Sequence, residues 1–390
     1  MKVIVAHNTY RTRGGEDQVF EDEVRMLETN GHNVSTFVRR NTDFSGLDTI
    51  RVAAGTVWNR SASSELEELV RSERADVVHF HNWLPQLSQA AFYGAHAGGA
   101  AVVQTLHNYR YTCAPGVLYR DGAVCEECVG KSVGWPAVRH GCYRGSRAAT
   151  VPVVTALGVH KAMRTVEKKL DAIIVLSRFA ERKMIEAGLP EDRLYLKPNF
   201  VSPDPGPGRG DGGYCVYVGR LVDNKGIETL LTAWETSPSA PNLKIAGAGP
   251  LEDHVAEVAA RRTNIEFLGR VDPSVVPALM GDAVCSIVPS VNYEGFPKTI
   301  VESFAVGTPV IASDIGSLTE IIRQGGTGYL VPPGDSSALA GAVSSPEHFA
   351  SLRGMRTAAR EAYTDHYTLD ANYRRLIEIY DEAVQHRKSG

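Results

Sequence analysis

The chain alternates apolar runs of strand length with stretches of helical periodicity, and this alternation restricts its fold more than any other feature. In the first half the apolar runs are residues 2–7, 33–39, 76–81, 100–107, 171–177 and 193–198. After the first run, Val19, Val24 and Leu27 line one side of a predicted helix, and Gly31 is suited to end it. Buried apolar strands that alternate with helices are typical of a parallel sheet covered on both faces.

The alternation begins again after residues 203–213, PDPGPGRGDGG, which have no periodicity and which we interpret as a linker. Further apolar runs follow at residues 214–219, 243–247, 265–269, 283–290, 309–314 and 328–333, and the chain ends in a long amphipathic pattern. Its 390 residues are also about twice the size of a common domain. The sequence therefore predicts an α/β protein of two doubly wound, Rossmann-like domains that face each other across a cleft.

The net charge of the chain argues against one class of partner. The formal net charge is −4, so no general electrostatic attraction to nucleic acid is expected. The opening segment, MKVIVAHNTYRTRGGED, has an apolar run too short for a signal peptide. No stretch approaches the roughly 20 apolar residues that a helix needs to cross a bilayer. We therefore expect a cytoplasmic protein.

Two glycine-rich motifs match dinucleotide-binding fingerprints in composition only. Gly208, Gly210 and Gly213 have the G-x-G-x-x-G spacing, but they precede a predicted strand instead of following one. GAGPLE, residues 247–252, does follow a strand, yet Glu252 stands where the third glycine is needed. A nicotinamide cofactor is therefore not expected.

Histidines gather where the predicted strands of the first domain end. His7, His79, His81 and His107 lie there, and ligands of doubly wound sheets bind outside the carboxyl ends of the strands. Any one of them could equally be a buried histidine that bonds a backbone carbonyl. Several at one sheet edge favour a polar site.

One loop in each half has the composition of an anion site. RTRGGED, residues 11–17, allows close approach of a ligand to the backbone at Gly14 and Gly15, although it could also be a simple tight turn. In the second half, Arg220 and Lys225 follow a strand and together suit a diphosphate, although most such cations are solvated surface charges.

A third anion site is expected in EGFPKTIVE, residues 294–302. A helix that begins near Lys298 would point its free N–H groups toward a ligand. The chain contains no Asp-x-Asp motif. We therefore expect a diphosphate to be neutralised by Arg220, Lys225 and the helix end, with no cofactor required for catalysis.

These segments, in chain order, closely resemble the retaining glycosyltransferases of family GT4, which have the GT-B fold. The most specific element is the E-x7-E pair of Glu294 and Glu302. The match runs over nearly the whole chain and is carried by RGGED, GRLVDNKGIETLLTAW, LKIAGAGP, EGFPKTIVESFAVGTPVIASDIGSLTEII and GTGYLVPPGD.

The resemblance implies a division of labour between the domains. Residues 1–200 are expected to bind the acceptor and residues 201–366 the nucleotide-sugar donor, with closure on binding. Residues 367–390 are expected to form a helix that crosses back onto the first domain.

The resemblance also implies roles for single residues at the donor. Glu302 is expected to bind the ribose hydroxyls, Glu294 the hydroxyls of the donor sugar, and Arg220 and Lys225 the diphosphate. The other residues expected at the donor are Gly14, Gly15, Val271, Gly295, Phe296, Pro297, Lys298 and Thr299.

His107 matches the family histidine beside the donor sugar, and we assign it a positioning role. His79, His81 and Tyr109 are expected on the acceptor side. The family's usual mechanism is front-face substitution, in which the leaving phosphate helps to deprotonate the acceptor. No protein nucleophile is then needed, and catalysis is expected to depend on His107, Arg220, Lys225 and Glu294.

The expected reaction is transfer of a sugar, of the hexosyltransferase type, from a UDP- or GDP-sugar to a hydroxyl group. The acceptor is expected to be a saccharide, a lipid-linked molecule or a small molecule, in the synthesis of a polysaccharide, a glycolipid or a glycosylated metabolite. Two alternatives stay open on the same scaffold: a nucleotide-sugar epimerase, and an inactive nucleotide-sugar-binding subunit.

An insertion at about residues 108–145 departs from the family pattern. It contains four of the six cysteines, spaced C-x11-C-x2-C-x13-C. In a cytosolic chain this spacing favours a structural zinc site over disulfides, although incidental thiols or a redox pair stay open. The expected ligands are Cys113, Cys125, Cys128 and Cys142.

A basic region follows around the apolar run ATVPVVTALGV. Two interpretations stay open: peripheral contact with the inner face of a membrane or with an anionic acceptor, and an ordinary solvated face over a core helix. Its cations are Arg139, Arg144, Arg147, Lys161, Arg164, Lys168 and Lys169.

Overall fold

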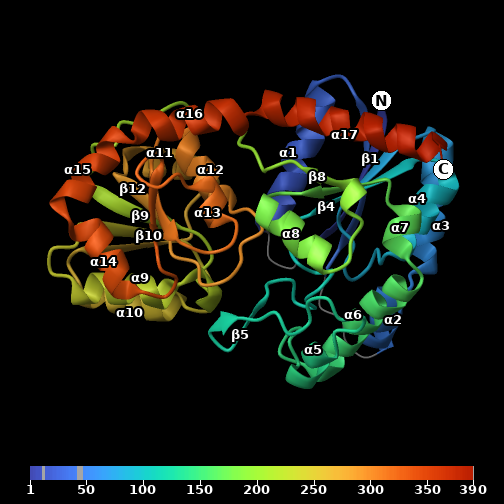
Figure 1. Cartoon of the computed structure of the whole chain (residues 1–390), viewed down its shortest axis with the longest axis horizontal. Helices are drawn as coiled ribbons and strands as arrows, with labels where there is room; N and C mark the ends of the chain where they lie inside the picture. Colours follow the sequence, from blue (N-terminus) through green and yellow to red (C-terminus); the bar gives the residue numbers. More distant parts are fainter. Residues whose placement is uncertain (11–13, 42–46, 390) are drawn as a thin grey trace. The chain divides into compact units, whose positions relative to one another are not determined.

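The structure, a computed structural model, describes residues 1–10, 14–41 and 47–389 (Figure 1). The chain divides into two compact units. The first, here called the amino domain, comprises Met1–Leu118, Glu126–Pro198 and Asn372–Gly390. The second, here called the carboxyl domain, comprises Tyr119–Cys125 and Asn199–Ala371. The main division therefore falls at residues 198/199, close to the boundary predicted after residue 200.

The amino domain is built on a six-stranded parallel sheet in the order β2-β1-β3-β4-β7-β8. Both β3 and β4 are buried along their full length, as continuous apolar strands between two helical layers must be. The strands are β1 (Lys2–Thr9), β2 (Asn33–Arg40), β3 (Val77–Asn82), β4 (Ala101–Leu106), β7 (Ala172–Val175) and β8 (Leu194–Leu196). The helices are α1 (Gly15–Thr29), α2 (Leu47–Val57), α3 (Arg60–Glu73), α4 (Ala90–Gly98), α5 (Trp135–His140), α6 (Arg147–Ala162), α7 (Thr165–Lys169) and α8 (Arg178–Glu186), with a 3-10 turn at Glu191–Arg193.

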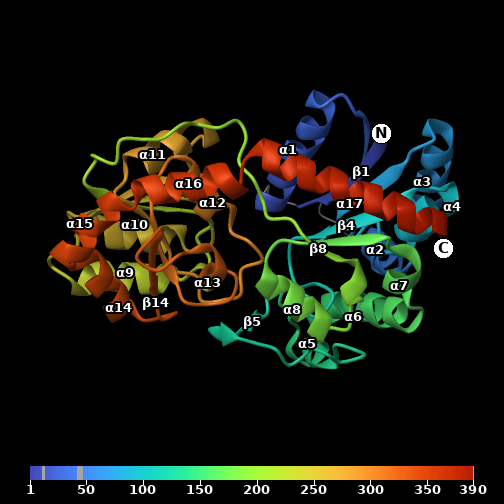
Figure 2. The same cartoon turned by 45° about the horizontal axis from the view of Figure 1, so that its top comes forward.

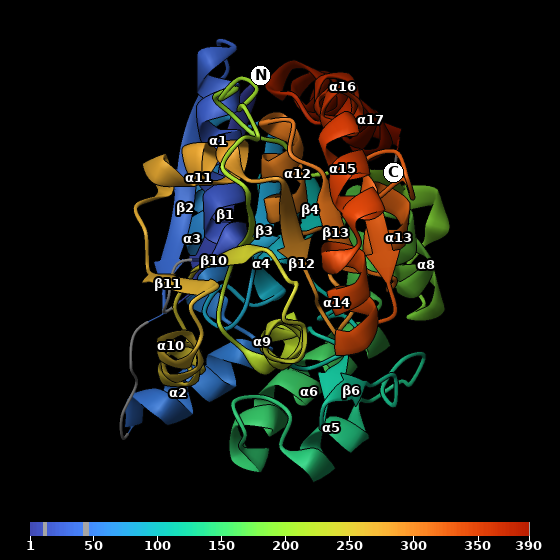
Figure 3. The ribbon, with the colours of Figure 1, turned by 90° about the vertical axis from the view of Figure 1, so that its left-hand side faces the viewer.

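The carboxyl domain contains a second six-stranded parallel sheet, in the order β11-β10-β9-β12-β13-β14 (Figure 3). Trp234 is fully buried in its core, and the indole N–H donates to the Pro241 carbonyl at 2.7 Å. The strands are β9 (Tyr214–Val218), β10 (Asn242–Ala246), β11 (Ile265–Gly269), β12 (Cys285–Val288), β13 (Val310–Ser313) and β14 (Gly328–Val331). The helices are α9 (Ile227–Thr236), α10 (Glu252–Arg261), α11 (Val276–Asp282), α12 (Lys298–Ala305), α13 (Leu318–Ile321), α14 (Ser336–Ser344), α15 (Pro346–Gly354) and α16 (Arg356–His366), with 3-10 turns at Asp223–Lys225 and Pro273–Val275.

The prediction of two Rossmann-like domains is confirmed, since each predicted apolar run overlaps one strand of these sheets. The order of the second sheet is that of the dinucleotide-binding Rossmann fold, with its switch point between β9 and β12. In the first sheet the strand order reverses between β1 and β3. The loops that leave these four strands are therefore where a ligand is expected.

The predicted linker at residues 203–213 is a packed segment of the carboxyl domain. The N–H groups of Gly208, Gly210 and Gly212 donate to the carbonyls of Val306, Gly281 and Asp282. A Cβ atom on Gly208 would lie 2.3 Å from the Gly281 backbone. The interpretation as a free linker is therefore wrong, because these glycines allow two backbones to touch.

The last helix, α17 (Leu369–Ser389), belongs to the amino domain from Asn372 onward. Figures 1 and 2 show it running along that domain. The Asn372 side chain donates to the Pro198 carbonyl, and the Tyr380 hydroxyl lies 2.8 Å from Nδ1 of His79 in β3. Polar contacts thus join this helix to the sheet at positions far apart along its length.

The hairpin strands β5 (Tyr119–Arg120) and β6 (Ala123–Val124) lie in the predicted insertion and pair antiparallel. In the described ranges, no helix combines the length and the apolar character needed to cross a membrane.

Candidate active site

The carboxyl domain places a lysine and a glutamate together at its switch point. Lys225 lies in the loop after β9, and Glu294 lies in the loop after β12. Lys225 Nζ donates to Glu294 Oε1 at 2.6 Å, with side-chain exposures of 22% and 11%. The Ser290 hydroxyl donates to the same oxygen at 2.6 Å. Two of the predicted donor residues thus form one ion pair.

Close backbone packing brings these two loops together. Gly226 has φ +71°, and a Cβ atom there would lie 1.8 Å from the Pro289 carbonyl oxygen. The Val291 N–H also donates to the Asn224 carbonyl. Only glycine fits at residue 226, because both its conformation and the space around it exclude a side chain. The position of Lys225 beside Glu294 therefore depends on the glycine at residue 226.

Electrostatics keeps Glu294 ionised. Burial raises the pKa of its carboxyl group, but the charge of Lys225, the hydrogen bonds from Lys225 and Ser290, and the charge of Arg220 lower it below its ordinary value overall. Arg220 is exposed, and its carbonyl accepts a hydrogen bond from the Tyr217 hydroxyl. Glu294 is therefore an anion at neutral pH and cannot act as a general acid there.

The helix predicted near Lys298 is α12, which begins at that residue. Phe296 and Pro297 are buried ahead of it, and the Phe296 carbonyl accepts from the Asn199 side chain. Glu302 is half-buried within the helix, one turn after Lys298. The remaining predicted donor residues, Gly295, Thr299 and Val271, are all partly exposed.

The GAGP segment after β10 has a structural role. A Cβ atom on Gly247 would lie 1.9 Å from the Gly219 carbonyl oxygen, and one on Gly249 would lie 2.4 Å from the Leu221 carbonyl oxygen. The two loops also share a backbone hydrogen bond, since the Leu221 N–H donates to the Ala248 carbonyl. The glycines of this motif therefore support the loop that carries Arg220.

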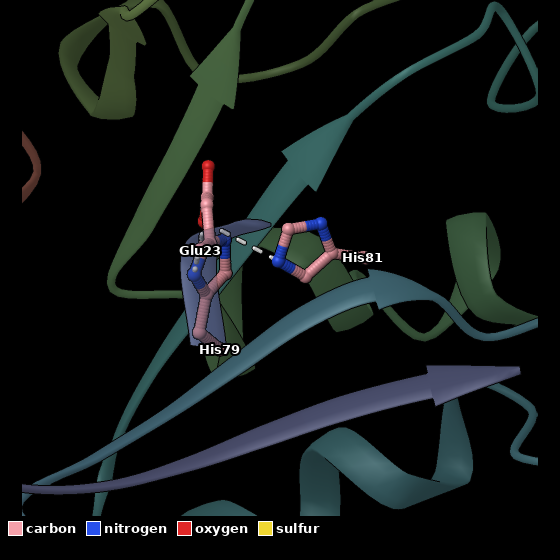
Figure 4. A group of neighbouring side chains, drawn as sticks. All are labelled: Glu23, His79 and His81. Carbon is pink, nitrogen blue, oxygen red and sulfur yellow. Dashed lines mark ion pairs between the residues drawn. The ribbon is translucent and has the colours of Figure 1, made fainter. Parts of the chain in front are cut away.

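In the amino domain a buried ion pair lies under the strand ends. Glu23 of α1 accepts from Lys197 Nζ at 2.5 Å, and neither side chain is more than 1% exposed. The other carboxylate oxygen of Glu23 lies 3.3 Å from His81 Nε2 and 3.5 Å from His79 Nδ1 (Figure 4). Sequence reasoning missed Glu23 and Lys197, because helix and strand patterns do not reveal which buried charges meet.

His79 and Tyr109 do not offer an acceptor any surface. His79 is fully buried, with Nε2 2.7 Å from the Thr105 hydroxyl and Nδ1 2.8 Å from the Tyr380 hydroxyl. Tyr109 is 1% exposed and packs edge-on against Phe179. Both side chains are therefore part of the core of the amino domain, and any role on the acceptor side would be indirect.

His107 lines a small pocket with several polar groups. Its Nε2 atom lies 2.9 Å from Nδ1 of His81, and the two rings stack. Glu16 and Arg110 line the same pocket. Burial raises the pKa of Glu16, although the Tyr10 hydroxyl donates to its carboxylate and lowers it in part. Sequence reasoning missed Glu16 and Arg110, although Glu16 lies within the RGGED motif.

Gly14 and Gly15 lie where a ligand loop was expected, although residues 11–13 of that loop lie outside the described residues. Asp17, two residues after Gly15, accepts from the N–H groups of Gly14 and Tyr10. It also lies 2.9 Å from His7 Nε2. The start of α1 is therefore held to the end of β1 through this carboxylate.

One cluster of metal-ligand type occurs among the described residues: Glu23, His79 and His81. Its charge balance argues against a dication there. Lys197 already neutralises Glu23, so a divalent ion would leave two uncompensated positive charges in the interior. We interpret the cluster as a neutral hydrogen-bonded network.

The four cysteines of the insertion are each half-buried. They are not gathered into a ligand cluster in the described part of the chain. Burial raises the pKa of the Cys113 thiol, although backbone N–H groups of Leu118, Gly116 and Val117 donate to its sulfur. Such N–H donors also suit a metal-bound thiolate. The zinc site therefore stays a prediction.

Comparison with known proteins identifies the class first. Residues 13–205 match the family model "Glycosyltransferase Family 4", and residues 212–345 match "Glycosyl transferases group 1". The two matches cover most of both domains. The protein is therefore a glycosyltransferase, and it belongs to family 4, as the resemblance implied.

Individual relatives support this assignment. The chain is 30% identical to phosphatidyl-myo-inositol mannosyltransferase of Mycobacterium leprae over 56% of its own length and 61% of that protein. It is 27% identical to glycogen synthase of Mycobacterium tuberculosis, over 80% of its length and 69% of that protein.

Solved structures show the same fold at lower identity. Anabaena HepE in complex with UDP has a TM-score of 0.67 and 16% identity, with 97% of this chain and 99% of that chain covered. Sucrose-phosphate synthase from Thermosynechococcus elongatus has a TM-score of 0.72 and 18% identity, with 98% and 99% covered. These structures are GT-B glycosyltransferases, so the predicted fold class is confirmed.

We predict about one tightly bound zinc ion per chain, held by Cys113, Cys125, Cys128 and Cys142. Elemental analysis of protein purified without added zinc measures it. Cys128→Ser should lower both the zinc content and the thermal midpoint, because binding of a structural zinc contributes folding free energy. Cys285→Ala, in the core of the carboxyl domain, is the control and should retain the metal. A fully active protein that contains no zinc would contradict this prediction.

Proposed function

We propose that the protein is a retaining glycosyltransferase that moves a sugar from a UDP- or GDP-sugar to a hydroxyl acceptor. The observation that carries the proposal is the Lys225–Glu294 pair at the carboxyl-domain switch point, just ahead of the helix that contains Glu302. A cation, a helix amino terminus and two carboxylates suit the successive parts of a nucleotide-sugar. The binding of UDP by the structural neighbour HepE supports the same class of donor.

Within this proposal each donor residue has its own part of the ligand. Glu302 binds the ribose hydroxyls, and Glu294 binds hydroxyls of the transferred sugar. Arg220 and Lys225 neutralise the diphosphate and stabilise it as a leaving group. The backbone of residues 295–297, with Lys298 and Thr299 at the start of α12, lies alongside the sugar and phosphates.

The ionised state of Glu294 favours this interpretation over a hydrolase-like acid/base pair. A glycosidase needs one carboxyl group that is protonated near neutral pH. Here Lys225 keeps Glu294 ionised, so the carboxylate is suited to accept hydrogen bonds from sugar hydroxyls. In the proposed front-face reaction, the leaving phosphate helps to deprotonate the acceptor hydroxyl, and the sugar keeps its anomeric configuration.

The acceptor is proposed to bind in the pocket of the amino domain that His107, Glu16 and Arg110 line. These groups can donate to and accept from hydroxyl groups. The names of the relatives, which include a phosphatidyl-myo-inositol mannosyltransferase and a glycogen synthase, support a lipid-linked or saccharide acceptor in carbohydrate biosynthesis.

The two glutamates can be separated by titration with the nucleoside diphosphate alone. Glu302→Ala should weaken the affinity for UDP or GDP about 10- to 150-fold, because a hydrogen bond to a charged group contributes about 1.5–3 kcal/mol. Glu294→Ala should not weaken that affinity, because Glu294 meets only the sugar and its removal frees Lys225 to bind the diphosphate. It should lower turnover. Calorimetry measures both variants, with Glu347→Ala on the exposed part of α15 as the control. Unchanged affinity in both variants would contradict the assignment.

Turnover should not need a divalent ion, because Arg220, Lys225 and the start of α12 neutralise the diphosphate. Assays in excess EDTA should therefore retain most activity. Zinc content is measured in the same samples, so that loss of the structural ion is not mistaken for loss of a catalytic one. Complete inactivation that Mg²⁺ or Mn²⁺ alone reverses would show that the diphosphate site is misassigned.

The proposal extends to the location of the reaction at the inner face of a membrane. Residues 129–170 carry eight Lys and Arg against one carboxylate, Glu167, in a chain of net charge −4. Of the exposed large apolar side chains among the described residues, Val133, Trp135, Val151, Met163 and Ile185 belong to the amino domain, and only Val275 to the other. Exposed apolar side chains, together with an excess of cations in the same domain, are complementary to anionic lipid.

We predict that the protein sediments with vesicles that contain phosphatidylglycerol and less with vesicles of phosphatidylcholine alone. Trp135→Ser, at a side chain that is 66% exposed, should weaken the binding, as should Arg144→Ser with Arg147→Ser, since each cation near an anionic surface contributes about 1 kcal/mol. Val275→Ser is the matched control, because Val275 is 50% exposed on the carboxyl domain. Equal binding by all variants, or none by the wild type, would show that this face is simply solvated.

A further inference from the structure

His107 is held by a chain of buried polar contacts that begins at Glu23. Glu23 Oε2 lies 3.3 Å from His81 Nε2, and His81 Nδ1 lies 2.9 Å from His107 Nε2. Within the described residues, neither Glu23 Oε2 nor His81 Nε2 forms an aligned hydrogen bond, so their 3.3 Å contact is an electrostatic one between two buried polar atoms. The three groups come from α1, β3 and the end of β4, so the contact chain exists only in the folded domain.

The carboxylate determines where the protons of this chain lie. Ionised Glu23 can only accept, so the 3.3 Å approach of its carboxylate is electrostatically favourable when His81 carries its proton on Nε2. The reverse arrangement would face a nitrogen lone pair toward a buried carboxylate, and the two negative ends would repel each other. With its proton on Nε2, neutral His81 has a lone pair on Nδ1. His107 Nε2 must then be the donor of the second bond.

We infer that Glu23, acting through His81, is a positioning group that fixes His107 as one neutral tautomer, with the proton on Nε2 and the lone pair on Nδ1. The inference uses the buried contacts alone. Its consequence for catalysis rests on the proposed function.

The charge balance of the network agrees with neutral rings. Lys197 cancels the charge of Glu23, so no positive charge on a histidine is needed for neutrality. Burial lowers the pKa of His81 and, more strongly, that of His107, and the remaining charges of the cluster do not reverse this. At neutral pH both rings are therefore neutral, with a proton on only one of their two nitrogens. A fixed tautomer requires this state.

A fixed tautomer gives His107 one chemical role. The ring is partly exposed in the pocket that it shares with Glu16 and Arg110. Because Nε2 donates its proton to His81, Nδ1 is the ring nitrogen of His107 that can accept a hydrogen bond. The group that it recognises is a hydroxyl, of the kind that a sugar or a sugar acceptor offers. His107 then orients its substrate without a change in its own protonation.

The first test reads the tautomer directly and needs no turnover. Long-range ¹H–¹⁵N correlation spectra of the labelled full chain distinguish a protonated ring nitrogen from one with a lone pair, and His107→Gln assigns the signal. We expect Nδ1 of His107 to be unprotonated and Nε2 to carry the proton. The opposite tautomer, or a signal averaged between the two, would overturn the inference. This result is independent of whether the protein transfers sugars.

A pair of variants tests the path through His81. His81→Phe removes both contacts and should change the His107 signal to that of mixed tautomers. It should also lower kcat about 10- to 100-fold with little change in KM, as loss of a group that orients a functional histidine does. His79→Phe is the matched control, since it lies on the same strand, is as deeply buried and approaches the same carboxylate, but does not contact His107.

The outcomes separate positioning from general destabilisation. His79→Phe should lower thermal stability and leave the His107 tautomer as it is. An identical spectral change in both variants would show that His81 acts only as part of the core and would overturn the inference. Should the His81 variant not fold, the wild-type spectrum alone decides the tautomer.

Discussion

The amino domain depends on the buried ion pair between Glu23 and Lys197. Removing one partner of such a pair typically costs about 3–5 kcal/mol, because the other charge is left in the interior. Lys197 also donates to Asn372 of α17, so this one cation joins the first helix, the last strand of the sheet and the last helix of the chain. Because Lys197 already balances the charge of Glu23, the neighbouring histidines need not be protonated. Three histidine rings can therefore stay neutral inside the protein.

The carboxyl domain also contains a lysine–glutamate ion pair, but this one is less deeply buried. Lys225 and Glu294 remain partly exposed at a loop edge, where solvent screens their attraction. Such a pair can exchange partners with a ligand, since a diphosphate competes for the lysine and a sugar hydroxyl for the carboxylate. The difference in burial gives the two pairs different roles, because the fully buried pair holds a domain together and the partly exposed pair is available for binding.

Much of the fold can be predicted from the pattern of apolar residues along the chain. The predictions that are wrong have physical causes. Continuous apolar runs predicted the strands, because a strand buried on both faces tolerates few polar residues. The glycines at 208–212 were misread as a linker, since composition cannot distinguish a glycine chosen for flexibility from one chosen for close contact. His79 and Tyr109 are expected on the acceptor side, but their side chains pack into the core, which position along the chain does not reveal.

The amino-acid sequence was enough to predict the succession of strands and helices along the chain, the family, and the residues expected at the strand ends, including Lys225, Glu294 and His107. Those features are local, or are repeated in order along the chain. Which of these groups meet became clear only from the folded chain. Glu23, His81 and Lys197 are far apart in the chain, and their pairing depends on sheet order and depth of burial. Because a hydrogen bond depends on position to within about half an ångström, no spacing in the sequence could show it.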